Sequence, residues 1–167
     1  MTDRNIVWQA PETSRWIASS AAVRPVREAM VDRARGTLLG LAVGNLLGLP
    51  VEGERHDWIA EAYPERLTEI DPREVSQPMD DDLAQAIDLG DALLAEGDYA
   101  RDFADRLVVW ARENGRGIGI TTREVIRELS TDKPIPEPAR IVYERRNRIA
   151  PNGGVMRCAP VVHGGAV

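Results

Sequence analysis

Apolar residues recur along this chain at the spacing of α-helices, and few segments alternate as β-strands do. From about Arg27, the stretch VDRARGTLLGLAVGNLLGLP keeps helical spacing and stops at Pro50. The same pattern predicts helices from about Met79 to Ala95, from Tyr99 to Glu113, from Thr121 onward and over 138–148. Residues 51–76 are irregular and polar and indicate a loop or a short helix. The pattern therefore predicts a largely helical fold.

The periodicity also predicts which face of each helix is buried. In the helix that starts near Met79, one face carries Leu83, Ala86, Ile87, Gly90 and Leu94. In the next helix, the predicted inward residues are Phe103, Leu107, Trp110 and Ala111. TTRE, residues 121–124, has the pattern of a capping box and predicts the start of the following helix.

The first helix carries a glycine at every fourth position, at residues 36, 40, 44 and 48. This spacing leaves one helical face without side chains, which costs helix stability. Such a face is useful where another backbone or a ligand comes close. Close helix packing and ligand contact are therefore the two interpretations of the stripe.

Composition limits the class of protein. The 167 residues suit one domain, which we place at 26–167 after an N-terminal extension at 1–25. The net charge of −6 argues against nucleic acid as a partner. A single cysteine, no recognisable signal peptide and no expected membrane span lead us to expect a cytoplasmic protein.

Three consecutive carboxylates stand at the start of the second main helix, at Asp80, Asp81 and Asp82. Acidic residues are favourable there because the helix dipole and free N–H groups attract negative charge. Three adjacent acids also repel one another unless a cation relieves them, and hard oxygen ligands suit Mg²⁺, then Mn²⁺ or Ca²⁺. A solvated helix start and a metal site both fit this pattern.

Three other segments offer chemistry. Glu52 follows a Gly-Leu-Pro turn, where no helix dipole favours a carboxylate. GRGIGITT, residues 115–122, is a glycine-rich loop whose amides could hold phosphate or could simply connect two helices. APNGGVMRCAP, residues 150–160, contains a tight turn, and Cys158 in it reads as a small buried residue rather than a nucleophile paired with His163.

In this order, the segments resemble the ADP-ribosylglycohydrolase family. That family has a glycine-spaced first helix with Gly-Asp-x-x-Gly-x-x-x-Glu, and here Gly44, Asn45, Gly48 and Glu52 stand in that pattern. Its Thr-Asp-Asp-Thr signature corresponds to residues 79–82. GRGIGITT and PNGGVMRCAP match two further family motifs, the second in all but its first glycine.

The resemblance implies an all-α, compact multi-helix bundle, apparently truncated here. It implies Mg²⁺, one or two ions with Mn²⁺ as an alternative, and hydrolysis of the bond between ADP-ribose and a protein or small-molecule acceptor. By position, Asp80, Asp81 and Asp82 would be metal ligands, and Glu52 and Asp81 catalytic. The implied substrate-binding residues are Gly117, Ile118, Gly119, Asn152, Gly153 and Met156.

The chain departs from the family pattern in three ways. Met79 and Asp82 replace the two threonines, and Asn45 replaces an aspartate. Family members run to about twice this length, with a further Asp-x-Asp-Thr metal motif near the C-terminus. We therefore keep three hypotheses: a hydrolase completed by missing sequence or a partner chain, a catalytically degenerate relative that binds ADP-ribose or a related nucleotide, and an interaction or homo-oligomerisation module.

Overall fold

The computed structural model describes residues 20–161 except 66, 132 and 150, with side chains from residue 28 onward. This part contains seven α-helices and no strand, which confirms the all-α fold class. Two short 3₁₀ turns, η2 and η3, complete the order of elements. The elements are α1 Ser20–Gly48, η2 Leu49–Val51, α2 His56–Ala62, α3 Pro72–Val75, α4 Asp81–Leu94, α5 Tyr99–Glu113, α6 Ile120–Leu129, α7 Glu137–Arg145 and η3 Asn152–Gly154.

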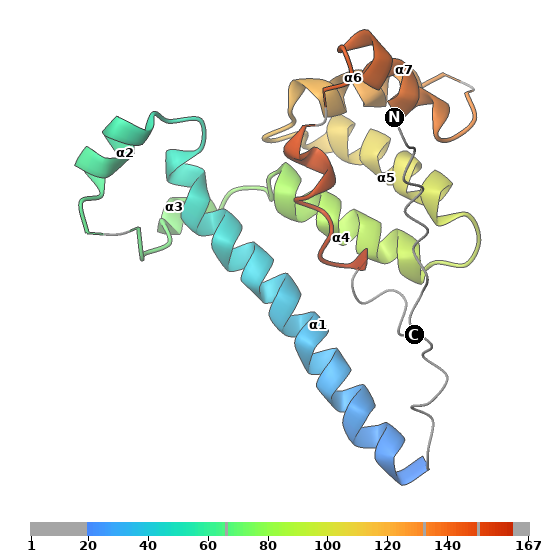
Figure 1. The fold of residues 1–167 in the computed structure, drawn as a ribbon, viewed down its shortest axis with the longest axis horizontal. Helices are drawn as coiled ribbons and strands as arrows, with labels where there is room; N and C mark the ends of the chain where they lie inside the picture. Colours follow the sequence, from blue (N-terminus) through green and yellow to red (C-terminus); the bar gives the residue numbers. More distant parts are fainter. Residues whose placement is uncertain (1–19, 66, 132, 150, 162–167) are drawn as a thin grey trace, which may run out of the picture.

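The helices form two parts that meet at the end of α1 (Figure 1). Helices α4 to α7 pack in sequence order, α4 on α5, α5 on α6, and α6 on α7. Helix α1 is a long rod that leans on α4 and projects away from this group, with α2 and α3 beyond its C-terminal end. The junction of α1 and α4 therefore brings together two of the segments singled out in the sequence.

Local signals place several helix ends where the sequence predicts them. Helix α5 runs from Tyr99 to Glu113 because the Asp98 carboxylate accepts hydrogen bonds from the backbone N–H groups of Ala100 and Arg101. Helix α1 ends at Gly48, where Pro50 fits the 3₁₀ turn that follows.

Two helix boundaries differ from the predicted ones. The capping box at Thr121 is wrong, since α6 begins at Ile120 with Gly119 as its N-cap and no side-chain cap. The Glu124 carboxylate instead accepts a hydrogen bond from Arg146 Nη1 at 3.0 Å, joining α6 to the end of α7. Helix α7 stops at Arg145, before the predicted end, because Asn147 and Arg148 adopt positive φ.

The core lies between α4 and α5 and is built largely of small side chains. The buried residues of α5 include Leu107 and Trp110, as predicted. The predicted face of α4 is only partly right, since Ile87 and Leu94 are exposed. Asp81 and, one turn later, Gln85 are buried, so the helix is rotated from the predicted orientation. The apolar residues on its buried side are Ala84, Ala86, Leu89 and Ala92.

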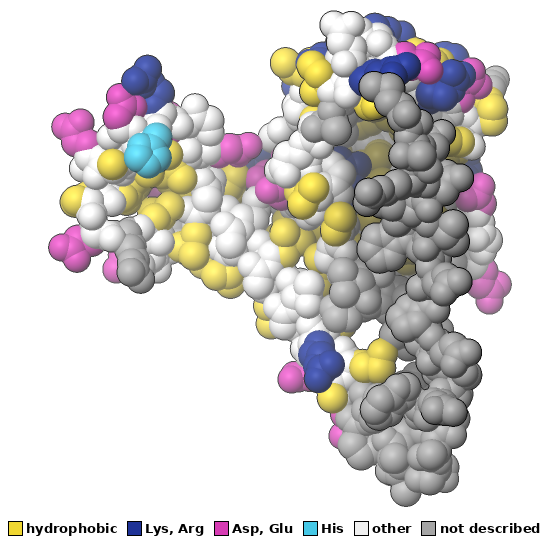
Figure 2. Space-filling model, in the orientation of Figure 1, with side chains coloured by type: hydrophobic (Ala, Val, Ile, Leu, Met, Phe, Trp, Pro, Cys, Tyr) yellow, Lys and Arg dark blue, Asp and Glu magenta, His cyan; other side chains and the backbone are white. Residues whose placement is uncertain are grey.

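Helix α1 is largely exposed within the described part of the chain. Large apolar side chains reach the surface along it, among them Leu39 with 66% of its area exposed and Val43, and hydrophobic side chains are visible along this arm (Figure 2). By length and composition alone, Glu28–Val51 would pass as a membrane span. The expectation that no segment approaches a span is therefore wrong by this criterion. A core helix of a soluble protein can pass the same test, but such a helix is mostly buried, whereas none of this window is buried within the described residues.

The glycine stripe of α1 does not pack against another described backbone. A Cβ built at residue 36, 40, 44 or 48 would meet no atom within 4 Å. Most of the N-terminal extension, and His163 with the end of the chain, lie outside the described residues, so the domain division at 25/26 stays a prediction.

Candidate functional site

Asp80 occupies the N-cap of α4 without acting as a cap. Its backbone is extended, yet its carboxylate accepts no hydrogen bond from the first turn of the helix. Asp98 and Asp71 do cap their helices in this way. Only 3% of Asp80 is exposed, and its Oδ2 accepts a hydrogen bond from Asn45 Nδ2 of α1 at 2.9 Å. Its buried Oδ1 has no partner. The interpretation of the acids as a solvated helix start therefore fails at Asp80.

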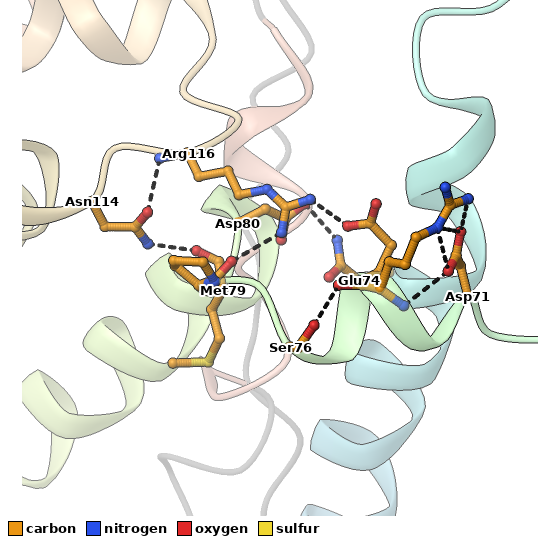
Figure 3. Close-up of polar contacts among 10 residues, drawn as sticks. Asp71, Glu74, Ser76, Met79, Asp80, Asn114 and Arg116 are labelled. Atoms are coloured by element: carbon orange, nitrogen blue, oxygen red, sulfur yellow. Dashed lines mark hydrogen bonds and ion pairs between the residues drawn. The ribbon is translucent and has the colours of Figure 1, made fainter.

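The segment before α4 is fixed from the far end of α5 (Figure 3). Asn114 Nδ2 donates to the Met79 carbonyl at 2.6 Å, and Arg116 Nη1 donates to the Pro78 carbonyl at 3.0 Å. Arg116 also pairs with Glu74 of α3. These bonds hold the backbone so that Asp80 enters the interior instead of turning back onto its own helix.

Burial and mutual repulsion raise the pKa of the other two acids. Burial, then the charges of Asp82, Asp80 and Glu52, raise the pKa of Asp81 to about 6. Burial and Asp80 also raise the pKa of Asp82, while the Asn45 amide and the Arg157 charge lower it. These acids therefore form one electrostatic unit that a nearby positive charge would relieve.

The glycine-rich loop after α5 lies directly against this unit. Gly117 has φ +77°, and a Cβ built there would stand 2.5 Å from Asp81 Oδ1. A side chain at this position would collide with the carboxylate and would also strain the backbone. Gly117 is therefore required for the close approach of the loop to the start of α4.

A pocket of about 520 Å³ opens between the C-terminal half of α1, the start of α4 and η3. Its polar lining residues are Asn45, Glu52, Asp82 and Asn152. The remainder of the wall is apolar or bare, and is formed by Gly40, Leu41, Gly44, Gly48 and Leu49. Three of the four stripe glycines thus face a cavity, which favours the ligand interpretation of the stripe over helix packing.

Arg157 lies beneath the turn that carries Asn152. Its Nη2 would stand 3.0 Å from a Cβ at Gly153, and its Cζ lies 5.7 Å from the centre of the Phe103 ring on α5. Burial lowers the pKa of Arg157, while the charges of Asp81 and Asp82 raise it. Its Nε is buried without a hydrogen-bond partner.

The structure gathers some of the expected site residues and separates others. Glu52, Asp82 and Asn152 share the pocket, and Asp80, Asp81 and Gly117 lie beside it or at the α4 start. Ile118, Gly119, Gly153 and Met156 do not line the pocket. Within the described part of the chain, no three acidic, histidine or cysteine side chains form a group that could hold a metal ion.

The chain belongs to the ADP-ribosylglycohydrolase family, whose model matches residues 26–166. Two curated relatives agree with this assignment. One is the ADP-ribosyl-[dinitrogen reductase] glycohydrolase of Rhodospirillum rubrum, 31% identical over 77% of this chain and 43% of the relative. The other is the ADP-ribosylarginine hydrolase Tri1 of Pseudomonas putida, 33% identical over 74% of this chain and 36% of the relative. No solved structure matches significantly.

The matched segments thus cover about two-fifths of the length of these relatives. The family assignment confirms the resemblance in the sequence motifs.

Sequence reasoning missed two residues of the site. In the sequence, Asn45 stands out only as a departure from the family pattern, and nothing local signals its hydrogen bond to Asp80. Arg157 lies within the motif at 150–160, and only tertiary structure places it against Gly153 and Phe103.

Proposed function

We propose that this chain forms part of a hydrolase that removes ADP-ribose from a protein or small-molecule acceptor and depends on a divalent cation. One observation carries the proposal. Asp80 is a buried carboxylate that caps nothing and keeps an unpartnered oxygen, beside a pocket that holds Glu52 and Asn152. A buried, unpartnered charged oxygen is costly unless the site has another occupant.

The donor atoms at the start of α4 suit magnesium or manganese. The unpartnered Asp80 Oδ1 and the raised pKa of Asp81 both indicate a negative site that lacks a counter-charge. Asp80 and Asp81 would hold the ion, with Asp82 as a third oxygen source on the pocket side. No three acidic, histidine or cysteine side chains converge in the described residues, so these carboxylates would have to close around the ion, and water or further polypeptide would supply its remaining oxygen ligands. The ion would supply positive charge to the ribose hydroxyls and to the attacking water.

The chain's own residues offer the remaining roles. The Glu52 carboxylate is exposed on the pocket wall and can accept a proton from a water molecule that attacks the anomeric carbon. Asp82, on the same wall, would stabilise the oxocarbenium-like transition state through its negative charge. The amides of the 117–119 loop would bind the diphosphate, and the Asn152 amide would bind sugar hydroxyls.

The proposal for the acceptor is supported by the names of the relatives, an ADP-ribosylarginine hydrolase and an ADP-ribosyl-[dinitrogen reductase] glycohydrolase. We propose an arginine side chain as the acceptor here.

The exposed apolar side chains of α1, including Leu38, Leu39 and Val43, support the proposal that further polypeptide, a second copy or a partner chain, covers this helix in the active protein.

Binding of ADP-ribose without turnover is the second candidate, and two features favour it. Asn45 already donates a hydrogen bond to Asp80, which replaces part of what a cation would provide. At Met79 the family's hydroxyl is replaced by a thioether, a poor ligand for a hard ion, and this side chain is half exposed.

Calorimetric titration of the purified chain with Mg²⁺ and then with ADP-ribose tests the proposal. We expect Mg²⁺ binding that Asp80→Ala and Asp81→Ala weaken far more than Asp82→Ala. Release of ADP-ribose from ADP-ribosylated arginine would select the hydrolase, and binding alone would select the second candidate. Absence of both Mg²⁺ and ADP-ribose binding, in this chain and in the chain together with the polypeptide that completes it, would refute both functions.

A further inference from the structure

We propose that Arg157 is the positioning residue that fixes the η3 turn, and with it Asn152, against the acidic start of α4. This proposal rests on the proposed function for its catalytic meaning, but its structural content can be tested without a ligand. Arg157 is a largely buried cation that interacts with three separate elements, η3, α5 and the start of α4.

The first contact is with the turn itself. Gly153 is the middle residue of η3, and a Cβ there would stand 3.0 Å from Arg157 Nη2 and 3.4 Å from Thr122 Oγ1 of α6. The first separation is tighter than most real Cβ contacts and the second is an ordinary van der Waals distance, so Arg157 and Thr122 of α6 both lie close to the side of the turn that a Cβ at 153 would occupy. A bulkier residue at 153 would push the turn away from Arg157.

The second contact is with α5. The Arg157 guanidinium lies over the Phe103 ring, at 5.7 Å from its centre, which is within the range of a cation–π interaction. Phe103 is itself half-buried in a helix whose neighbours form the core. The ring therefore gives the guanidinium a rigid support.

The third interaction is electrostatic. Asp81 and Asp82 both interact favourably with Arg157, and no ion pair within 4.0 Å joins it to either acid in the described structure. The Arg157 charge therefore acts on both acids without a direct ion pair. Removing this charge would leave the negative charges of Asp81 and Asp82 less balanced, and the η3 turn would lose its contact with the guanidinium.

Hydrogen exchange of the peptide covering 151–158 tests this directly in the full chain. Three amides in it bond within the turn: those of Val155 and Met156 to the Asn152 carbonyl, and that of Cys158 to the Val155 carbonyl. We expect Arg157→Met to accelerate their exchange by about tenfold while exchange in α5 stays unchanged, because loss of a charged partner opens the segment locally.

Two further variants and a control sharpen the test. Arg157→Lys keeps the charge and loses the planar stack, so its exchange should lie nearer to wild type than to Arg157→Met. Gly153→Ala adds a methyl group that crowds Arg157 Nη2 and should also accelerate exchange. This second variant decides the test if Arg157→Met does not fold. Arg112→Met makes the same chemical change at an exposed site on α5 and should leave the peptide unchanged.

Unchanged exchange in both Arg157→Met and Gly153→Ala overturns the inference. So does equal acceleration in the lysine and methionine variants, since side-chain volume alone would then explain the effect. ADP-ribose titration separates this inference from the proposed function. If wild type binds ADP-ribose, Arg157→Met should weaken it by about tenfold. If wild type does not bind, the proposed function fails while the exchange data still decide the role of Arg157.

Discussion

Replacing Gly44 by leucine tests whether the bare face of α1 is kept open for a ligand. Gly44 lines the pocket, whereas Gly36, two turns earlier on the same stripe, does not. A Cβ at either position meets no atom within 4 Å, so neither substitution causes a collision at its first atom. Gly36→Leu is therefore a matched control with the same chemistry on the same helix.

Both substitutions should stabilise the chain. Leucine has a helix propensity close to that of alanine, and a glycine in an exposed helix interior costs about 0.8–1.0 kcal/mol relative to alanine. For a chain of this size, about 1 kcal/mol corresponds to a rise of about 2–4 °C in Tm. If another backbone packed closely on the stripe, both substitutions would lower Tm instead, because a leucine would collide with that backbone.

Ligand binding should separate the two variants. The leucine at 44 would occupy part of the roughly 520 Å³ pocket beside Asn45 and Asn152. We expect ADP-ribose affinity to fall about tenfold or more in Gly44→Leu, equivalent to about 1.4 kcal/mol, and to stay unchanged in Gly36→Leu. Thermal melts followed by circular dichroism and titration calorimetry measure both effects. Equal affinity in the two variants, or a lower Tm in both, would refute the reasoning.

Two other predictions concern the carboxylates. The pKa of Asp81 is raised to about 6, so the folded state binds the proton more tightly than the unfolded state, and stability falls as pH rises from about 4 to 6. Asp81→Asn should therefore stabilise the metal-free chain at pH 7 by about 2–3 kcal/mol, and this gain should vanish near pH 4. Urea unfolding in EDTA at both pH values measures the gain in unfolding free energy. A gain that does not depend on pH would contradict the raised pKa of Asp81. Glu52→Ala should leave ADP-ribose affinity within about twofold and lower hydrolysis by about 10²-fold or more where hydrolysis is present. Glu54→Ala, an exposed acid outside the pocket wall, is the control, and loss of affinity alone in Glu52→Ala would contradict its role.

Helix positions followed from local signals, and their errors came from tertiary contacts. Helix α5 was predicted to the residue because Asp98 and the apolar period act within the helix itself. The predicted capping box is wrong because the Glu124 carboxylate pairs with Arg146, the C-cap residue of α7, a contact that no local pattern reveals. The buried face of α4 was misjudged since hydrophobicity ranks Ile87 above Gln85, whereas burial of Asp81 turns Gln85 inward.

The site was predictable in its parts but not in its connections. Motif spacing placed Asp80, Glu52 and Asn152 as candidates, and the fold brings the latter two to one pocket. Spacing could not show that the Asp80 side chain does not cap α4, because its position depends on the hydrogen bonds that Asn114 and Arg116 donate to the preceding backbone. The sequence alone also leaves two interpretations of the glycine stripe, and the cavity along three of its glycines favours ligand contact over helix packing.

Asn45 gives the sharpest view of how this chain departs from its family, where the resemblance places an aspartate. The Asn45 amide donates to Asp80 Oδ2 at 2.9 Å, so the present residue contributes a donor where the family residue would contribute a second anion. Asn45→Asp removes the hydrogen bond and sets two partly buried carboxylates in contact, which should cost about 1–3 kcal/mol without metal.

A divalent cation should reverse this cost, since a second carboxylate beside Asp80 strengthens an oxygen site. In melting experiments, Asn45→Asp should lose about 2–4 °C per kcal/mol in EDTA and should gain more from Mg²⁺ than wild type does. Asn45→Ala removes the donor without adding charge, so its loss in EDTA measures the hydrogen bond alone. An equal Mg²⁺ shift in wild type and Asn45→Asp would show that Asp80 lies outside any cation site, and the metal-dependent proposal would fail with it.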